Sequence, residues 1–339
     1  MRYIDYKTVL PRTVAGVLVF LIVILPVFTT NVITLSVFIS SGIWAIAAMG
    51  FTLILRTGQF SLGQAAFMAI GGYTSAIFTV NLGWSFWPSF LLAGTVSGII
   101  ALIIGSIVLR VGGTYFSIIT LALSEVVRII AQQWESVTRG TRGLITSPPS
   151  PIVIDGFEIN FYASTVPYFY LMVLLVAITA VVFWQIGRSR IGGTFYSIAA
   201  NPILAEHQGI PLMKYRVIAF TVAGLFTGFA GSLYAHSLTV ITPYMLGLWQ
   251  SIQIMIMSIV GGISSLAGGP IIGSIVLYTF GIYLSRVEIY GIQQLLFGGV
   301  VVLVLLFLPK GTGLIDLWDR FWRKVVWREE EYEPDTPDD

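Results

Sequence analysis

Two ionisable side chains, Glu125 and Arg128, lie within an otherwise apolar stretch of the sequence. Residues three positions apart share one face of a helix, so the carboxylate and the guanidinium are placed to pair with each other. Charged groups inside a bilayer are costly and often mark a function, whereas a neutralised pair that faces other helices has a structural role. We predict an intramembrane ion pair, and its role stays open between these two.

Two glycine-broken stretches, residues 57–64 and 261–270, provide uncharged polar groups. Ser61 and Ser265, 204 residues apart, each begin a Ser-Leu-small sequence within them. A broken helix exposes backbone N–H and C=O groups, which are tolerated at membrane depth only inside protein or along a cavity. Matched interruptions in two halves of a chain indicate internal repeats around a transport path, although close helix packing explains the glycines equally well. The groups predicted to line such a path are Ser61, Gln64, Phe67, Ser264 and Ser265.

The segment of residues 188–214 is the longest internal loop predicted on the inner side of the membrane, and it contains the signals of a short helix. Asn201 followed by Pro202 is a favourable N-cap and first helical residue, and Gly209 is a favourable C′ residue. They delimit a helix at residues 203–208. Such a helix between two membrane spans is suited to docking a motor subunit. We expect the coupling site to consist of Asn201, Pro202, Glu206 and Gly209.

The sequence lacks the residues that several other chemistries need. It has no G-x-x-x-x-G-K-[ST] motif, so the chain has no phosphate-binding loop with which to hydrolyse ATP by itself. It has no cysteine, which excludes disulfides and thiolate ligands. The two histidines, His207 and His236, have no His/Glu cluster around them. We therefore expect a protein that is not an enzyme, that holds no metal or cofactor of its own and that binds no nucleic acid.

The composition identifies the elements that must position these residues. Of 339 residues, 56% are hydrophobic and 10% are charged, whereas soluble domains carry about 25% charge. Apolar runs of about 20 residues, each long enough to cross a bilayer, recur along the chain. We predict an all-α polytopic membrane protein with eight to ten transmembrane helices, some of them short or broken, and with an internal repeat. The ten segments are residues 13–30, 32–55, 63–80, 86–109, 113–134, 166–187, 215–236, 245–262, 267–285 and 290–308.

The basic residues predict the orientation of these segments. With the N-terminus in the cytoplasm, fourteen of the 18 lysines and arginines lie on the inner side, three lie outside and Arg128 lies within a span. This bias follows the positive-inside rule and places both termini in the cytoplasm. The first apolar run has no small-residue cleavage site, so we expect a retained helix rather than a signal peptide. The permease domain then covers residues 13–310, after a cytoplasmic N-terminus of residues 1–12.

The connections outside the spans are expected to be of three kinds. An outer loop covers residues 135–165, and a small hairpin around Asp155 and Gly156 fits its sequence. Residues 311–328 place apolar and basic side chains at helical spacing, which is typical of an amphipathic helix on the inner membrane surface. Residues 329–339 contain seven acidic residues and predict a disordered tail.

Several motifs resemble those of the permease subunits of branched-chain amino acid ABC importers, and they occur in the same order. They are LILRTGQFSLGQAAF at residues 53–67, GTYF at 113–116 followed by E-x-x-R at 125–128, AANP at 199–202, VGG at 260–262 and LFLPKG at 306–311. The resemblance covers about residues 40–315. The sequence departs from the family at Gln64, where histidine is usual, and at Ala200, where a charged residue is usual. The long outer loop is similar to that of the M-type of the two paired permeases.

This resemblance implies a subunit of a larger machine in a bacterial or archaeal plasma (inner) membrane. The implied partners are a second homologous permease, two cytoplasmic subunits that bind ATP, an extracytoplasmic solute-binding protein and the membrane lipid. The implied activity is import of branched-chain or other apolar amino acids, while related systems carry urea, short amides or aromatic acids. The competing classes are an ion-coupled secondary carrier and a passive channel. The scarcity of carboxylates within the spans favours a transporter that is driven by another subunit.

Overall fold

The computed structural model describes residue 26 and residues 31–154, 157–162, 164–285 and 298–299. Helices make up most of this part of the chain, which confirms the predicted all-α membrane fold. Some predicted segments lie outside the described residues: the N-terminal segment, the span at 13–30, the amphipathic helix at 311–328 and the acidic tail. The span at 290–308 lies outside them as well, except for residues 298–299.

Six helical segments of the described chain are long and apolar enough to cross a membrane. Their bounds agree closely with the predicted spans, because long apolar runs determine them. They are α2 (Val32–Leu55), α4 (Phe86–Val108), α5 (Gly113–Gln133), α7 (Thr165–Arg188), α10 (Leu212–Leu238) and the segment Pro243–Gly261. Helix α11 (Leu248–Gly261) forms most of the last segment, and two shorter apolar helices, α3 (Gln64–Val80) and α12 (Gly268–Ser285), also belong to the described bundle.

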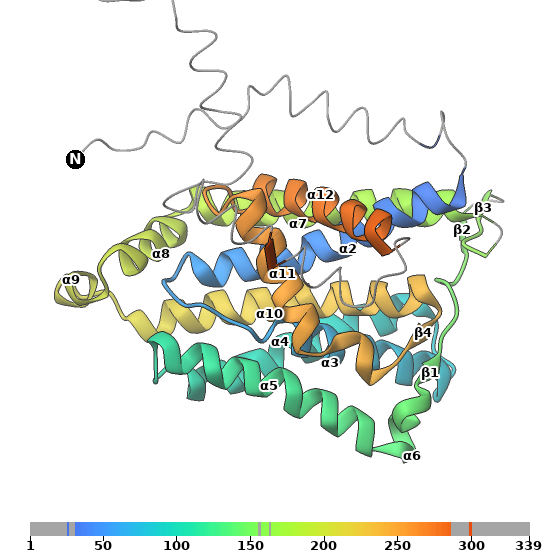
Figure 1. Ribbon diagram of the computed structural model, residues 1–339, viewed down its shortest axis with the longest axis horizontal. Helices are drawn as coiled ribbons and strands as arrows, with labels where there is room; N and C mark the ends of the chain where they lie inside the picture. The colour runs from blue at the N-terminus through green and yellow to red at the C-terminus, as the bar shows by residue number, and fades with distance from the viewer. Residues whose placement is uncertain (1–25, 27–30, 155–156, 163, 286–297, 300–339) are drawn as a thin grey trace, which may run out of the picture.

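Helix α10 is the centre of the bundle, and it packs against α2, α3 and α4 (Figure 1). Glycines make this packing close. A Cβ atom on Gly231 would lie 2.0 Å from the carbonyl oxygen of Met68 on α3, and one on Gly71 would lie 2.1 Å from the carbonyl oxygen of Gly228. Small residues allow helix backbones to approach in this way inside membranes.

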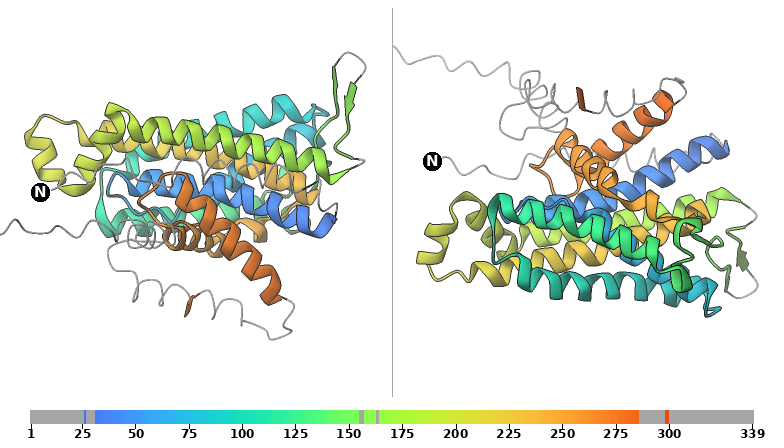
Figure 2. Two further views of the ribbon diagram at one scale, coloured as in Figure 1. Left: turned by 90° about the horizontal axis from the view of Figure 1, so that it is seen from above. Right: turned by 60° about the horizontal axis from the view of Figure 1, so that its bottom comes forward.

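The remaining helices surround this centre. Helix α2 packs between α7 and α12, α11 packs on α12, and α5 lies against α3 (Figure 2). The outward faces of α4 and α7 are largely apolar, as lipid contact or contact with another membrane subunit requires. Among the exposed side chains of these faces are Leu102, Ile103 and Ile107 on α4 and Leu174, Ile178 and Val181 on α7.

The two ends of the bundle carry different structures (Figure 1). One end, here called the α9 end, bears α8 (Arg190–Ala200) and α9 (Pro202–His207). The opposite end, here called the hairpin end, bears short elements: α6 (Glu135–Thr138), η2 (Gly140–Arg142), β1 (Leu144–Ile145), β2 (Ile152–Ile154), β3 (Phe157–Ile159), β4 (Val240–Ile241) and η3 (Pro243–Leu246).

The hairpin end confirms one prediction and adds a pairing that the sequence did not predict. Strands β2 and β3 pair antiparallel, with Ile152 opposite Ile159, as the expected hairpin requires. Strand β1 pairs antiparallel with β4, with Leu144 opposite Ile241. This second pairing fastens the outer connection to the end of α10, because β4 follows that helix directly.

The segment predicted as a loop at residues 188–214 is largely helical. Helix α8 begins directly after α7, and the side chain of Ser189 caps it by accepting a hydrogen bond from the backbone N–H of Gly192. Phe195 and Ile198 are buried on one face of α8, and the ring of Phe195 contacts that of Tyr215 on α10. The loop is therefore a rigid helical projection that is anchored to the bundle.

Candidate translocation and coupling sites

Hydroxyl groups on one face of α5 satisfy the backbone of the stretch between α2 and α3. The backbone N–H of Leu62 donates to Thr120 Oγ1 at 3.0 Å, and the hydroxyl of Ser124 donates to the Leu62 carbonyl oxygen at 3.0 Å. The hydroxyl of Ser117 donates to the carbonyl oxygen of Phe60 at 2.6 Å. Backbone groups of Phe60 and Leu62 in the first interruption are thus paired within the protein, as membrane depth requires, whereas Gln59 Oε1 and Gln64 Nε2 are buried without a hydrogen-bond partner among the described residues.

The sequence analysis missed this hydroxyl face of α5. Ser117, Thr120 and Ser124 are spaced three and four residues apart, which places them on one side of a helix. The face continues to α11, where Ser251 Oγ lies 3.2 Å from Ser124 Oγ and accepts a hydrogen bond from the backbone N–H of Ala65. The spacing was a usable signal, but the hydrogen-bonded partner could not be deduced from it.

Three of the predicted path residues lie in the interior of the subunit. Ser61, Gln64 and Phe67 are all buried. Gln64 Oε1 accepts a hydrogen bond from the hydroxyl of Thr227 at 2.8 Å, and the ring of Phe67 packs edge-on against Phe220 with centroids 5.2 Å apart. Gln64 and Phe67 therefore pack α3 against α10, and the role of all three residues in a transport path stays a prediction.

The other two predicted path residues, Ser264 and Ser265, belong to the second interruption, between α11 and α12. Ser264 is exposed and Ser265 is half-buried. Ser265 Oγ accepts a hydrogen bond at 3.0 Å from the backbone N–H of Gly268, so it helps to start α12. The guanidinium of Arg56 donates to the carbonyl oxygen of Ser264 and joins the two interruptions. The five residues do not form a single polar site, because three are interior and two lie at or near the surface.

The predicted ion pair is present on α5. Arg128 Nε lies 2.7 Å from Glu125 Oε2, and the side chains of Glu125 and Arg128 are 32% and 24% exposed. Glu125 Oε1 also accepts a hydrogen bond at 3.1 Å from the backbone N–H of Leu248, the first residue of α11. A negative charge at a helix N-terminus is favourable. Glu125 therefore stabilises the start of α11 in addition to pairing with Arg128.

A polar patch extends from this ion pair along α5 and α11. Arg128 Nη1 donates to Gln132 Oε1 at 3.2 Å, and Gln132 Nε2 donates to the hydroxyl of Tyr244 at 3.3 Å. Gln250 Oε1 accepts from the backbone N–H of Gly247 at 2.9 Å, and its amide group donates to the carbonyl oxygen of Tyr244. We call these five side chains the α5–α11 patch: Glu125, Arg128, Gln132, Tyr244 and Gln250.

The start of α9 is formed as the sequence predicts. Asn201 precedes the helix and accepts a hydrogen bond through Oδ1 from the backbone N–H of Leu204 at 3.0 Å. Pro202 occupies the first helical position, where its missing N–H has no cost.

The end of α9 has the geometry of a Schellman motif. Gly209 has a φ of 80°, and its N–H donates to the carbonyl oxygen of Glu206 at 2.9 Å. The N–H of Ile210 donates to the carbonyl oxygen of Ala205 at 3.1 Å. Both bonds satisfy carbonyls that a short helix leaves without partners. The predicted C′ role of Gly209 is confirmed.

The tip of this projection carries apolar side chains outside the membrane-spanning segments. Ile203 and Leu204 on α9 are 69% and 54% exposed, and Tyr196 on α8 is exposed as well. Contiguous exposed apolar residues on a rigid element mark an interaction surface. Neither lipid-facing spans nor the core explains these residues, because α9 lies beyond the end of the bundle (Figure 1).

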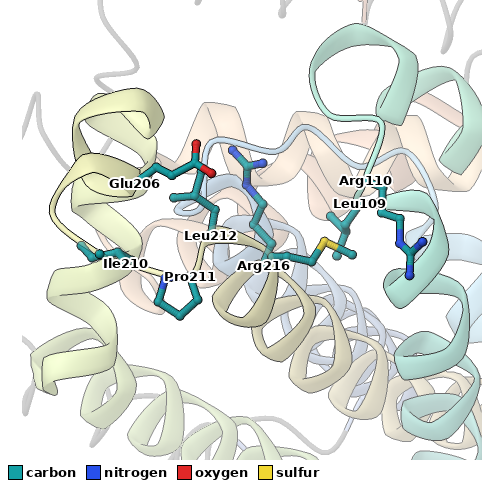
Figure 3. A pocket seen from close by; sticks show the side chains of 9 residues that line it. Leu109, Arg110, Glu206, Ile210, Pro211, Leu212 and Arg216 are labelled. Atoms are coloured by element: carbon teal, nitrogen blue, oxygen red, sulfur yellow. The ribbon is translucent and has the colours of Figure 1, made fainter.

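A hollow of about 600 Å³ lies between the base of α9 and the end of α4. Glu206 and Arg216 point toward one another across it, while Leu109 and Arg110 lie on the far side (Figure 3). The opposite charges of Glu206 and Arg216 attract each other. This attraction links α9 to the first turns of α10, the central helix.

Asn201→Ala should loosen α9 selectively. Loss of an N-cap oxygen costs about 1 kcal/mol, which raises the open population of the helix about fivefold. Amide hydrogen exchange at residues 204–208 should accelerate by that factor, with exchange in α10 unchanged as the internal control. Asn201→Ser keeps an oxygen acceptor and should restore slow exchange. Equal exchange in the alanine variant and the unmodified chain would contradict the capping role.

The histidines have no metal-binding arrangement among the residues that the structure describes. His207 is exposed on α9. His236 is buried, with Nδ1 2.6 Å from the carbonyl oxygen of Ser147 and Nε2 3.0 Å from Ser75 Oγ. Because a carbonyl only accepts, Nδ1–H donates to it, and in the neutral imidazole Nε2 then accepts from the hydroxyl of Ser75. His236 thus fastens the outer connection to α3 and α10. Over the described ranges, no three His, Cys, Asp or Glu side chains gather as metal ligands would.

Comparisons with known proteins agree on one family. Residues 33–308 match the family described as branched-chain amino acid transport system / permease component. The chain is 28% identical over 290 residues to the high-affinity branched-chain amino acid transport system permease protein LivM of Salmonella typhimurium. The alignment covers 79% of this chain and 67% of the relative. No solved structure is significantly similar to the chain.

Two further relatives are named for other substrates. The galactofuranose transporter permease protein YtfT of Escherichia coli is 27% identical over 66% of this chain and 62% of its own length. The autoinducer 2 import system permease protein LsrC of Yersinia pestis is 26% identical over 70% of this chain and 65% of its own length.

Proposed function

Because the chain belongs to the family of branched-chain amino acid transport system permease components, we propose that it is the membrane subunit of an ATP-driven importer for branched-chain or other apolar amino acids. In this proposal it forms half of the translocation path and responds to a separate ATPase. The observation that carries the proposal is the family match, which extends over every helix from α2 to α12.

The relatives support amino acids as the substrate class. The LivM relative, which is named for branched-chain amino acids, aligns with 79% of the chain, whereas the galactofuranose and autoinducer permeases align with 66% and 70%. An apolar amino acid is a zwitterion with an apolar side chain. Its path needs polar groups for the charged ends and apolar walls for the side chain, and the α5–α11 patch with its apolar surroundings offers both.

The projection at the α9 end supports coupling to an ATPase. We infer that Asn201, Pro202, Glu206 and Gly209 shape the docking helix and that Ile203 and Leu204 enter a groove on the ATPase. The N-cap, the Schellman motif and the buried face of α8 make the projection rigid, which a motion-transmitting contact requires. This assignment places the α9 end in the cytoplasm and the hairpin end on the side of the solute-binding protein. A homologous second permease would cover part of the apolar outer surface.

Co-purification with an ATP-binding subunit tests this proposal. The unmodified chain should retain the subunit in detergent, whereas the double variant Ile203→Asp, Leu204→Asp should lose it, because two buried contacts become charged. Ile145→Asp is the matched control, since Ile145 is equally exposed but lies at the hairpin end. An ion-coupled carrier or a passive channel would purify without any ATPase, and the double variant would then behave like the unmodified chain.

A further inference from the structure

We propose that Glu125 and Arg128 form a transient binding site for the two charged groups of a zwitterionic amino acid, on the surface that this subunit contributes to the path. The inference rests on the proposed function and adds the site that recognises the substrate's charges. In it, Arg128 receives the carboxylate and Glu125 receives the ammonium group.

Glu125 and Arg128 lie at membrane depth within the bundle. Glu125 and Arg128 follow the start of α5 by 12 and 15 residues, which places them about 18 and 22 Å along a helix of about 30 Å. Both therefore lie between the ends of a membrane span. Each side chain is at least about a quarter exposed in the subunit, and charged groups do not face lipid at this depth without cost. These charged groups must therefore be covered by another part of the complex or face a polar path.

Both side chains of the pair have hydrogen-bonding capacity beyond the bonds they make within the described part of the chain. A guanidinium has five N–H donors, and within the described part of the chain Arg128 uses one for Glu125 and one for Gln132. The remaining donors match a carboxylate in the paired geometry that arginine favours. The Glu125 carboxylate accepts from Arg128 and Leu248, and its two oxygens have about four acceptor positions. An ammonium group can occupy those that remain.

The surroundings of the pair fit the rest of such a substrate. Ile129 is exposed one helical turn from Glu125, and Val126 is exposed beside it. The interior positions Ser61, Gln64 and Phe67 are covered by this subunit's own helices, whereas the α5–α11 patch reaches the surface. A path that two permeases share must follow their surfaces. Among the described residues, the patch therefore presents this subunit's one ion pair at membrane depth, together with uncharged polar groups.

A purely structural pair predicts different behaviour. The N-terminus of α11 needs one oxygen acceptor from residue 125, and the amide oxygen of a glutamine supplies it. A structural pair therefore predicts that Glu125→Gln and Arg128→Gln alter stability alone. A substrate site predicts that transport falls while the ATPase remains responsive to the loaded solute-binding protein.

The test uses the complete complex in proteoliposomes, with leucine as the probe, and compares leucine uptake with ATP hydrolysis. Arg128→Gln should lower uptake per ATP hydrolysed about tenfold, the loss expected for charge-assisted hydrogen bonds, and Arg128→Lys should recover part of it. Arg188→Gln is the control, because it removes a cation from α7 rather than from α5. There the Arg188 guanidinium lies over the ring of Trp184. An unchanged ratio in Arg128→Gln would overturn this inference alone. No ATP-dependent uptake by the unmodified complex would overturn the proposed function as well.

A second measurement keeps the pair intact, so it does not depend on the folding of Arg128→Gln. The chain has no cysteine, and Ile129 and Ile178 are both 47% exposed, on α5 and α7. Ile129→Cys should react with a membrane-impermeant thiol reagent, and leucine delivered during ATP turnover should slow the reaction. Ile178→Cys lies on α7, away from the patch, where the inference expects no aqueous path, and it should remain unreactive. Equal reactivity of the two cysteines, or no effect of leucine on Ile129→Cys, would overturn the inference.

Discussion

Gly209→Pro should lower ATP-driven uptake about tenfold or more while the chain still inserts into the membrane. The ring of proline fixes φ near −65°, whereas Gly209 has a φ of 80°. Proline also lacks the N–H that donates to the carbonyl oxygen of Glu206. The Schellman motif is then lost, and α9 no longer holds Ile203 and Leu204 in the orientation that docking requires. Loss of about 1.4 kcal/mol of docking free energy is enough for a tenfold effect.

Two variants define the specificity of this result. Gly83→Pro is the matched control, because Gly83 also has a positive φ and no atom near its missing Cβ, but it lies between α3 and α4 at the hairpin end. It should leave ATPase association intact. Glu206→Lys should weaken association in the same direction as Gly209→Pro, because it places a second cation opposite Arg216. Normal uptake in both Gly209→Pro and Glu206→Lys would contradict the coupling role of α9.

Gly231→Val should prevent stable folding of the bundle. A Cβ atom at this position would lie 2.0 Å from the carbonyl oxygen of Met68, and this contact is with backbone rather than with a flexible side chain. Helices α3 and α10 would have to separate along their length. Overpacking in a core costs about 1–3 kcal/mol even where side chains adjust, so we expect a larger loss here. Thermal unfolding in detergent, followed by size-exclusion chromatography, measures it.

Gly193→Val provides the comparison for this variant. Gly193 lies on α8, and no atom lies within 4 Å of its missing Cβ. The substitution changes only helix propensity, by less than about 1 kcal/mol. The Gly193→Val variant should have a melting temperature close to that of the unmodified chain. If Gly231→Val melted at the same temperature as Gly193→Val, close packing of α3 on α10 would not support the bundle as described.

The sequence predicts best those features that depend on neighbouring residues. The apolar segment at 86–109 corresponds to α4 at Phe86–Val108, and that at 166–187 corresponds to α7 at Thr165–Arg188. The caps of α9 are also local, because Asn201, Pro202 and Gly209 act within one or two turns. These features follow from hydropathy and backbone geometry, which a short window of sequence contains.

Contacts between distant parts of the chain could not be deduced in the same way. Glu125 and Leu248 are 123 residues apart, so the pairing with Arg128 was predictable and the capping of α11 was not. The glycines of the first interruption correctly indicated a broken helix. They gave no information on the hydroxyls of α5 that satisfy it, or on the burial of Ser61, Gln64 and Phe67 by other helices.

The most direct test of the proposed function is uptake of radiolabelled leucine by proteoliposomes that contain the purified complex. Uptake should require ATP and the solute-binding protein, stop with a non-hydrolysable ATP analogue, and continue after ionophores collapse the proton and sodium gradients. The chain alone, without its ATPase, should give no uptake. Leucine uptake by the chain alone that depends on an ion gradient would contradict the assignment as an ATP-driven importer subunit.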